Sequence, residues 1–247
     1  MSTILGLLLK FIYQVVGHYG LAIIVFTVVV KMCLLPLTAA QNRSMASMQE
    51  IQPKMDEIKK KYPDNKDKQN QLIMELYQKH KVNPMMGCLP ILIQFPILIG
   101  LFNVLREPVK YVFTTEAAYA AADTGFLWIK SMATPDVITL AGISIPFILP
   151  ILAAITTFFE SYMMQKGQPK NPTTSVMLYM MPVLILVWGV SFPAGLSLYW
   201  AVSNIFSIIQ RRVTAYRKNN KETAKGGSKG LNNELCRSSW KNKRRSS

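Results

Sequence analysis

Five apolar segments, each about 17–20 residues long, divide this chain of 247 residues. A helix of that length crosses the hydrocarbon core of a bilayer, which is about 30 Å thick. The segments therefore predict an all-α membrane protein with five transmembrane helices. The chain is 50% hydrophobic and also carries a formal net charge of +15. The two properties coexist because apolar and basic residues occupy separate segments of the sequence. The predicted spans are residues 20–37, 86–105, 145–164, 175–192 and 194–210.

The basic residues gather on one side of these spans. Nine Lys and Arg residues lie in 38–85, two lie between the third and fourth spans and twelve follow residue 210, whereas the opposite side carries four. Lys and Arg accumulate in the cytoplasmic loops of membrane proteins. We therefore expect a multi-pass protein with its N-terminus outside the cell and its C-terminus in the cytoplasm.

The segments outside the spans have patterns of their own. The first 18 residues are apolar at helical spacing, which predicts an amphipathic interfacial helix, with a poor or truncated signal sequence as the alternative. Apolar residues recur every three or four positions on both sides of a turn at 63–65, which predicts a helical hairpin whose first arm Pro53 kinks or restarts. The predicted organisation is an N-terminal helix at 1–18, a membrane domain at 19–215 with a cytoplasmic hairpin at 38–85 and an extracytoplasmic loop at 106–144, and a disordered basic tail at 216–247.

Lys31 lies inside the first predicted span, where a charge is costly unless it reaches water or a partner. One reading is that its long stem reaches the cytoplasmic interface. The other is that Lys31 faces a hydrophilic groove that is open to the cytoplasm and binds substrate. Ser and Thr in membrane helices often bond to their own backbone, so each further candidate alone is weak evidence. The other residues predicted to line the groove are Gln94, Thr156, Thr157, Glu160, Ser203 and Asn204.

The sequence contains no pattern typical of a catalytic or metal-binding site. It has two histidines, three cysteines without a CxxC pair, and no cluster of His and Cys residues. We therefore expect no enzyme, no catalytic residues, no metal, no cofactor and no small-molecule substrate. A polybasic tail is typical of contacts with anionic lipids or RNA phosphate. The tail residues expected to contact lipid or ribosome are Arg217, Lys218, Lys241, Lys243, Arg244 and Arg245.

Four stretches together resemble the YidC family of membrane protein insertases. They are VVVKMCLLPLT at 28–38, IQPKMDEIKKKYP at 51–63, NPMMGCLPILIQFPILIGLFNVLR at 83–106 and FPAGLSLYWAVSNIFSIIQR at 192–211. The last stretch is the most specific, and its signature positions are Pro193, Gly195, Leu196, Tyr199 and Trp200. Without a large extracytoplasmic domain, the chain is similar to the compact form of Gram-positive bacteria.

The resemblance implies an insertase and chaperone of the bacterial plasma membrane, which acts on nascent membrane proteins alone or beside the Sec translocon. It also implies that the basic tail helps to recruit ribosomes. Lys31 stands where the family usually has a groove arginine, and Gln94 matches the glutamine of the second span. Lysine keeps the charge but lacks the planar fork of arginine. A small-solute channel or transporter, or a passive scaffold that docks ribosomes, are the competing hypotheses.

Overall fold

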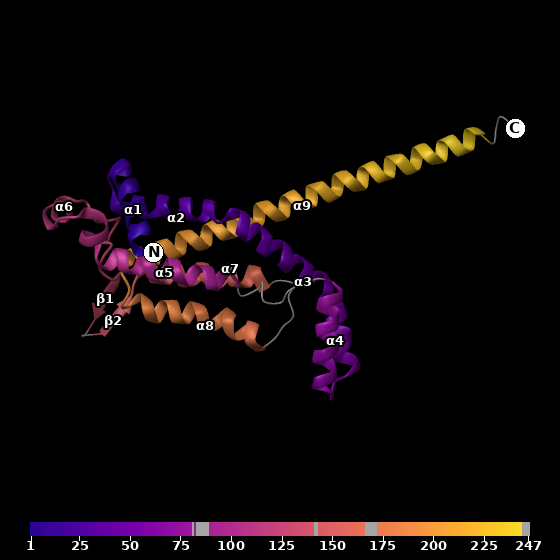
Figure 1. Ribbon diagram of the computed structural model, residues 1–247, viewed down its shortest axis with the longest axis horizontal. Coiled ribbons are helices and arrows are strands. Elements are labelled where there is room, and N and C mark those ends of the chain that lie inside the picture. Colours follow the sequence, from indigo (N-terminus) through magenta and orange to yellow (C-terminus); the bar gives the residue numbers. More distant parts are fainter. Residues whose placement is uncertain (81, 83–88, 141–142, 166–171, 244–247) are drawn as a thin grey trace. The chain divides into compact units, whose positions relative to one another are not determined.

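The computed structural model describes residues 1–80, 82, 89–140, 143–165 and 172–243. The chain is mostly helical (Figure 1) and divides into two compact units, Met1–Phe206 and a second unit that begins at Ser207. The helices are α1 (Ser2–Val16), α2 (Tyr19–Cys33), α3 (Leu35–Lys61), α4 (Lys66–Lys79), α5 (Leu89–Arg106), the π-helix η2 (Val109–Phe113), α6 (Glu116–Ala121), α7 (Ile148–Gln165), α8 (Pro172–Gly189) and α9 (Ala194–Lys243). Two strands, β1 (Val137–Leu140) and β2 (Ile143–Pro146), precede α7.

Helix α1 packs against α2, α5 and η2 through one apolar face. Leu5, Leu9 and Ile12 are buried on that face because they recur at helical spacing. The opposite face is also apolar and exposed, and it carries Ile4, Leu7, Phe11 and Val15. The helix is therefore apolar on two sides, and its predicted place in the membrane interface stays a prediction.

The first predicted span does not continue as one helix to residue 37. Helix α2 ends at Cys33, and α3 begins at Leu35 after a bend of 60°. Pro36 stands in the first turn of α3, where the missing N–H of proline costs no helical hydrogen bond. Hydropathy along the chain carries no signal for this bend, and the extent of the first span stays a prediction. Lys31 consequently lies in the last turn of α2 and not in the middle of a helix.

Helices α3 and α4 contact each other and enclose a small apolar cluster of their own. Ile51, Met55 and Val82 are buried there, and Asn65 caps α4 by accepting a hydrogen bond from the Lys68 amide at 3.0 Å. Helix α3 runs through Pro53 without a break in its assignment, so Pro53 does not restart it.

The segment after α5 contains more regular structure than a plain loop. The strands β1 and β2 pair antiparallel, with Val137 opposite Pro146 and Ile138 opposite Ile145. Ile145 and Pro146 belong to this strand pair. The helix of the third predicted span, α7, therefore begins at Ile148 and not at residue 145. The Asp136 carboxylate caps that helix, since its Oδ2 accepts a hydrogen bond from the Leu149 amide at 2.8 Å.

The same connection holds the start of α9. The Ala194 amide donates to the Thr134 carbonyl at 2.8 Å, and the Gly195 amide donates to the Met132 carbonyl at 3.0 Å. These amides have no partner inside their own helix, because the first four N–H groups of a helix lie beyond its hydrogen-bond ladder. Residues 132–134 therefore supply the acceptors that α9 lacks.

Helix α9 continues to Lys243, where composition predicted a disordered tail from residue 216. Extending a helix costs far less than nucleating one, and the apolar first part of α9 supplies the nucleus. Composition alone does not register a neighbouring nucleus, and the disorder of residues 216–247 stays a prediction. Arg244 and Arg245 lie outside the described residues.

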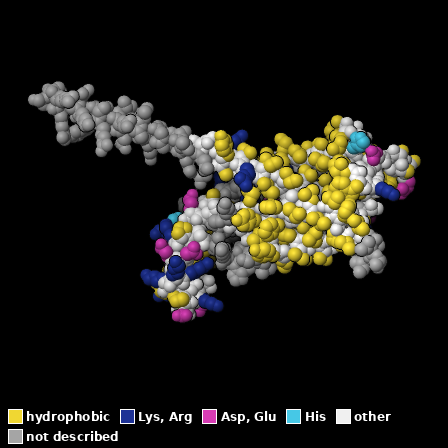
Figure 2. Space-filling view, turned by 180° about the vertical axis from the view of Figure 1, so that it is seen from behind, with side chains coloured by type: hydrophobic (Ala, Val, Ile, Leu, Met, Phe, Trp, Pro, Cys, Tyr) yellow, Lys and Arg dark blue, Asp and Glu magenta, His cyan; other side chains and the backbone are white. Residues whose placement is uncertain are grey.

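One described helix, α7, is long and apolar enough to cross a membrane, and the bent pair α2 and α3 qualifies as a second if it is counted as one span. Shorter apolar helices occur at Ser2–Val16, Leu92–Arg106 and Leu178–Gly189 within the described residues. Figure 2 shows hydrophobic side chains gathered over the helices of the Met1–Phe206 unit. The predicted count of five spans stays a prediction, and residues 86–88 of the second span lie outside the described part.

Candidate functional site

A buried polar cluster joins α7 to α9 within the first unit. Thr156, Thr157 and Asn204 are each less than one tenth exposed. The Asn204 side chain lies 2.7 Å from the Thr157 hydroxyl and 3.2 Å from the Thr156 hydroxyl. Both threonines also donate to the Ala153 carbonyl, one turn earlier. Three of the residues predicted to line a groove therefore meet in one hydrogen-bonded group.

Glu160 completes this cluster and fixes the orientation of the Asn204 amide. With the amide nitrogen toward Glu160, that nitrogen donates to Oε2 at 2.8 Å. The amide oxygen then accepts from the Thr157 backbone amide at 3.1 Å and lies within hydrogen-bond distance of the two threonine hydroxyls. A carboxylate only accepts hydrogen bonds, so the opposite orientation would set two acceptors against each other. One asparagine thus links a half-buried carboxylate to two hydroxyls.

Gln94 belongs to a second polar contact, with a residue of the family signature. Its Nε2 donates to the Tyr199 hydroxyl at 2.8 Å. The ring of Tyr199 is only 1% exposed and lies in the main apolar core. A buried phenol needs a partner because an unpaired polar group in an apolar surrounding is costly. The contact joins α5 to α9.

Tyr199→Phe should destabilise the protein by about 1–3 kcal/mol, because it removes the hydroxyl that Gln94 needs as an acceptor. The measurement is the loss of helical circular dichroism on heating in detergent. Tyr162→Phe is the matched control, since Tyr162 is 51% exposed on α7. Equal unfolding temperatures for Tyr199→Phe and the unmodified protein would contradict a contribution from this hydrogen bond.

Lys31 comes from a third element, the last turn of α2, and is half-buried. A cation in the last helical turn interacts favourably with the helix dipole. Ser203 is 4% exposed and precedes Asn204 on α9. Among the tail residues, Arg217 is exposed on α9, whereas the side chains of Lys218, Lys241 and Lys243 lie outside the described part.

The comparisons with known proteins identify the family. Residues 11–222 match the model of the family described as 60Kd inner membrane protein. A membrane protein insertase YidC of Fusobacterium nucleatum is 38% identical over 85% of this chain and 93% of that relative. The chain belongs to the YidC family of membrane protein insertases.

Other YidC relatives are longer. The YidC of Shewanella halifaxensis is 43% identical over 83% of this chain, which spans only 35% of that protein. A crystal structure of an active YidC insertase, with its first transmembrane domain resolved, has a TM-score of 0.61 and 30% identity. That match covers 87% of this chain and 45% of the other.

In this member of the family, most of the signature residues belong to the core. Pro193, Gly195, Leu196 and Tyr199 are buried, and Trp200 packs against the small cluster that contains Ala153 and Ala201. A Cβ on Gly195 would lie 2.9 Å from Ile23 and 3.2 Å from the Met132 carbonyl. The specific signature therefore reports how the start of α9 packs, and Gln94 bonds to one of its residues, Tyr199.

Sequence reasoning missed Asp136. This residue is 6% exposed, and its Oδ1 accepts a hydrogen bond from the Trp128 indole at 3.2 Å while Oδ2 caps α7. A single acidic residue shortly before an apolar helix was the available signal. This signal was not used, because residues 106–144 were predicted as an extracytoplasmic loop without elements of its own.

Proposed function

We propose that this chain inserts other proteins into the membrane and assists their folding as a chaperone, without catalysing a covalent reaction. The observation that carries the proposal is the buried cluster of Thr156, Thr157, Glu160 and Asn204, in a chain related to membrane protein insertases. Placing polar side chains inside a membrane protein costs free energy, and such residues usually serve its function.

The proposed site is a hydrophilic groove that is open to the cytoplasm. Lys31 supplies its positive charge, and the groove is lined by Gln94, Thr156, Thr157, Glu160, Ser203 and Asn204. Water in such a groove shortens the apolar path that a polar segment must cross. Lys31 attracts acidic residues of the segment, because charges interact more strongly where the dielectric constant is low. The apolar segment of the substrate then moves into lipid. This transfer is favourable by a free energy of about 25 cal/mol per Å² of apolar surface removed from water.

The proposed partners follow from the charge distribution. Nascent membrane proteins are the substrates, and the helical hairpin with the basic second unit contacts the ribosome and anionic lipids. The Sec translocon is a further proposed partner. In the proposed topology, five spans cross the plasma membrane with the N-terminus outside.

The test is insertion of a small single-span substrate with an acidic external segment into vesicles that contain the purified protein. Lys31→Ala should lower the insertion rate about tenfold, the effect of ~1.4 kcal/mol of lost attraction, and Lys31→Arg should retain it. Lys110→Ala, which removes an exposed charge beside Glu107, is the control and should have no effect. Unchanged insertion by Lys31→Ala would refute the role of this charge.

A further inference from the structure

An exposed apolar surface surrounds the start of α7, on the side of the protein predicted to lie outside the cell. We call it the outer apolar rim, and its residues are Leu127, Trp128, Ile138, Ile145 and Ile148. Each is between 40% and 76% exposed. Large exposed apolar groups that lie together mark an interaction site. The function proposed above does not use this surface.

The rim is held on a rigid support. Ile138 and Ile145 are paired across the two strands, so their side chains lie on the same face of the sheet. The Trp128 ring packs edge-on against Phe147 with 6.4 Å between ring centroids, and its indole nitrogen donates to Asp136. Since this donor is already satisfied, the ring can enter an apolar surrounding without leaving a polar group unpaired.

Leu127 stands at the tip of a tight turn that is closed by two hydrogen bonds between Phe126 and Ile129. Its backbone has φ of +54°, in the left-handed region that bulky residues rarely adopt. Strained backbone of this kind tends to persist at functional positions. The strain here keeps a 76% exposed leucine at the tip of the turn.

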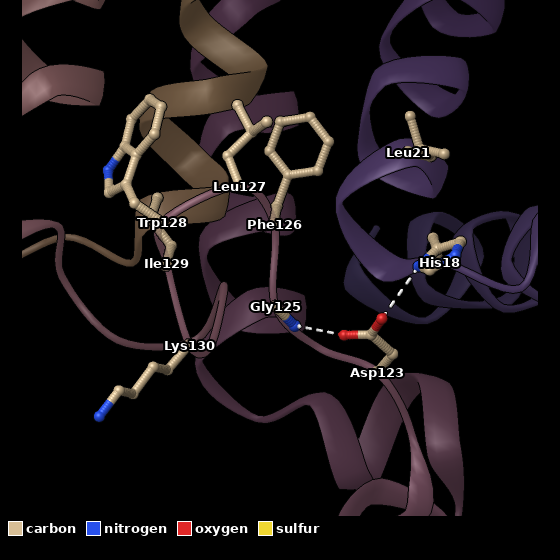
Figure 3. A pocket seen from close by; sticks show the side chains of 9 residues that line it. All are labelled: His18, Leu21, Asp123, Gly125, Phe126, Leu127, Trp128, Ile129 and Lys130. Carbon is tan, nitrogen blue, oxygen red and sulfur yellow. Dashed lines mark hydrogen bonds and ion pairs between the residues drawn. The ribbon is translucent and has the colours of Figure 1, made fainter.

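Polar and apolar side chains leave this turn on opposite sides. Figure 3 shows Phe126, Leu127 and Trp128 pointing in the direction in which α2 runs from His18 to Leu21, whereas Lys130 points the other way and the Asp123 carboxylate turns to His18 and the Gly125 amide. The His18 Nδ1 atom lies 3.0 Å from Oδ2 of Asp123, and both side chains are more than half exposed. A segment at a membrane surface needs this division between lipid and water.

The rim also continues an outward apolar face of α7. Ile148 opens that helix, and Ile151, Ile155 and Phe159 follow at helical spacing with exposures of 44%, 49% and 54%. Helix α7 has 18 residues and therefore spans about 27 Å, close to the thickness of the hydrocarbon core. If α7 spans the hydrocarbon core, the rim at its N-terminal end lies at the level of the lipid headgroups, where Trp is enriched.

We propose that the outer apolar rim is a lipid anchor that lies in the outer membrane–water interface and sets the depth of α7. Thr156 lies eight residues beyond Ile148, so the anchor would hold the polar cluster about 12 Å below the rim. The partner is the lipid bilayer itself, and the anchor would be present whether or not a substrate is bound.

The test uses an environment-sensitive fluorophore on Leu127→Cys or, separately, on Ile138→Cys, in a chain whose Cys33, Cys88 and Cys236 are replaced by alanine. The protein is reconstituted in phosphatidylcholine and phosphatidylglycerol vesicles without substrate. Spin-labelled lipids with the quencher near the top of the acyl chain should remove about twice as much fluorescence as lipids with a deep quencher, as expected for burial of about 5–10 Å.

A label on Ala117→Cys is the matched control, because Ala117 is exposed on α6 and does not belong to the rim. It should be quenched weakly by both lipids. Quenching of both rim positions at the level of Ala117 would overturn the proposal. Rim quenching that disappears on adding a substrate would also overturn it, since the surface would then receive substrate. Neither result depends on insertion activity, so failure of the anchor is distinguishable from failure of the proposed function.

Discussion

Replacing Gly20 by alanine should destabilise the protein by about 1–3 kcal/mol, because the added methyl group has no room. A Cβ at this position would lie within 2.6 Å of Cβ, Cγ and Cδ2 of Phe126. The clash includes the first atom of the phenylalanine side chain, so rotation of the ring does not relieve it. We expect the turn at residues 126–129 to separate from α2. The measurement is the thermal unfolding midpoint in detergent, together with proteolysis of this turn.

Gly100→Ala is the matched control for this prediction. Its Cβ would meet the terminal Cδ1 atom of Leu5 at 2.7 Å, and the end of a flexible side chain moves easily. Alanine also favours a helix interior over glycine by about 0.5–1 kcal/mol, which offsets part of the cost in α5. Equal destabilisation by the two substitutions would contradict the tight contact at Gly20.

Asp136→Ala is the second substitution for which we expect a large effect, a destabilisation of about 2 kcal/mol or more. The buried carboxylate accepts hydrogen bonds from the Leu149 amide and the Trp128 indole. Its removal leaves the first turn of α7 without a cap and the indole without a partner. The unfolding midpoint should fall. In a chain whose other three tryptophans are replaced by phenylalanine, Asp136→Ala should also change the emission of Trp128.

Asp123→Ala provides the comparison for Asp136→Ala. Asp123 pairs with His18, but its side chain is 60% exposed, and exposed ion pairs contribute about 0–1 kcal/mol. The two variants remove the same charge from the same connection between α5 and α7. If they lowered stability equally, the capping role of Asp136 would be wrong.

Hydropathy was sufficient to predict a mostly helical membrane protein, because long apolar runs have few other stable arrangements. It was not sufficient for helix ends. The bend after Cys33 and the strand pair before Ile148 depend on contacts between segments, which periodicity along one segment does not record. The helical course of α9 beyond residue 216 escaped prediction because composition was judged without the helix that precedes it.

The sequence was sufficient to predict which polar residues belong to the candidate site. It was not sufficient to predict which of them are hydrogen-bonded to one another. Thr156, Thr157 and Asn204 were named separately, and their hydrogen bonds join positions 47 and 48 residues apart. The contact between Gln94 and Tyr199 spans 105 residues. A single sequence offers no measure of such pairings, because each depends on how the helices turn toward one another.

The hydrogen bonds from Ala194 and Gly195 to the carbonyls of Thr134 and Met132 have a consequence for biogenesis. During synthesis, the connection before α7 emerges about 60 residues ahead of the segment that must occupy its acceptors. The membrane bundle therefore cannot close until its last helix has been made, and we expect chains truncated before residue 194 to stay open and sensitive to protease at residues 123–137.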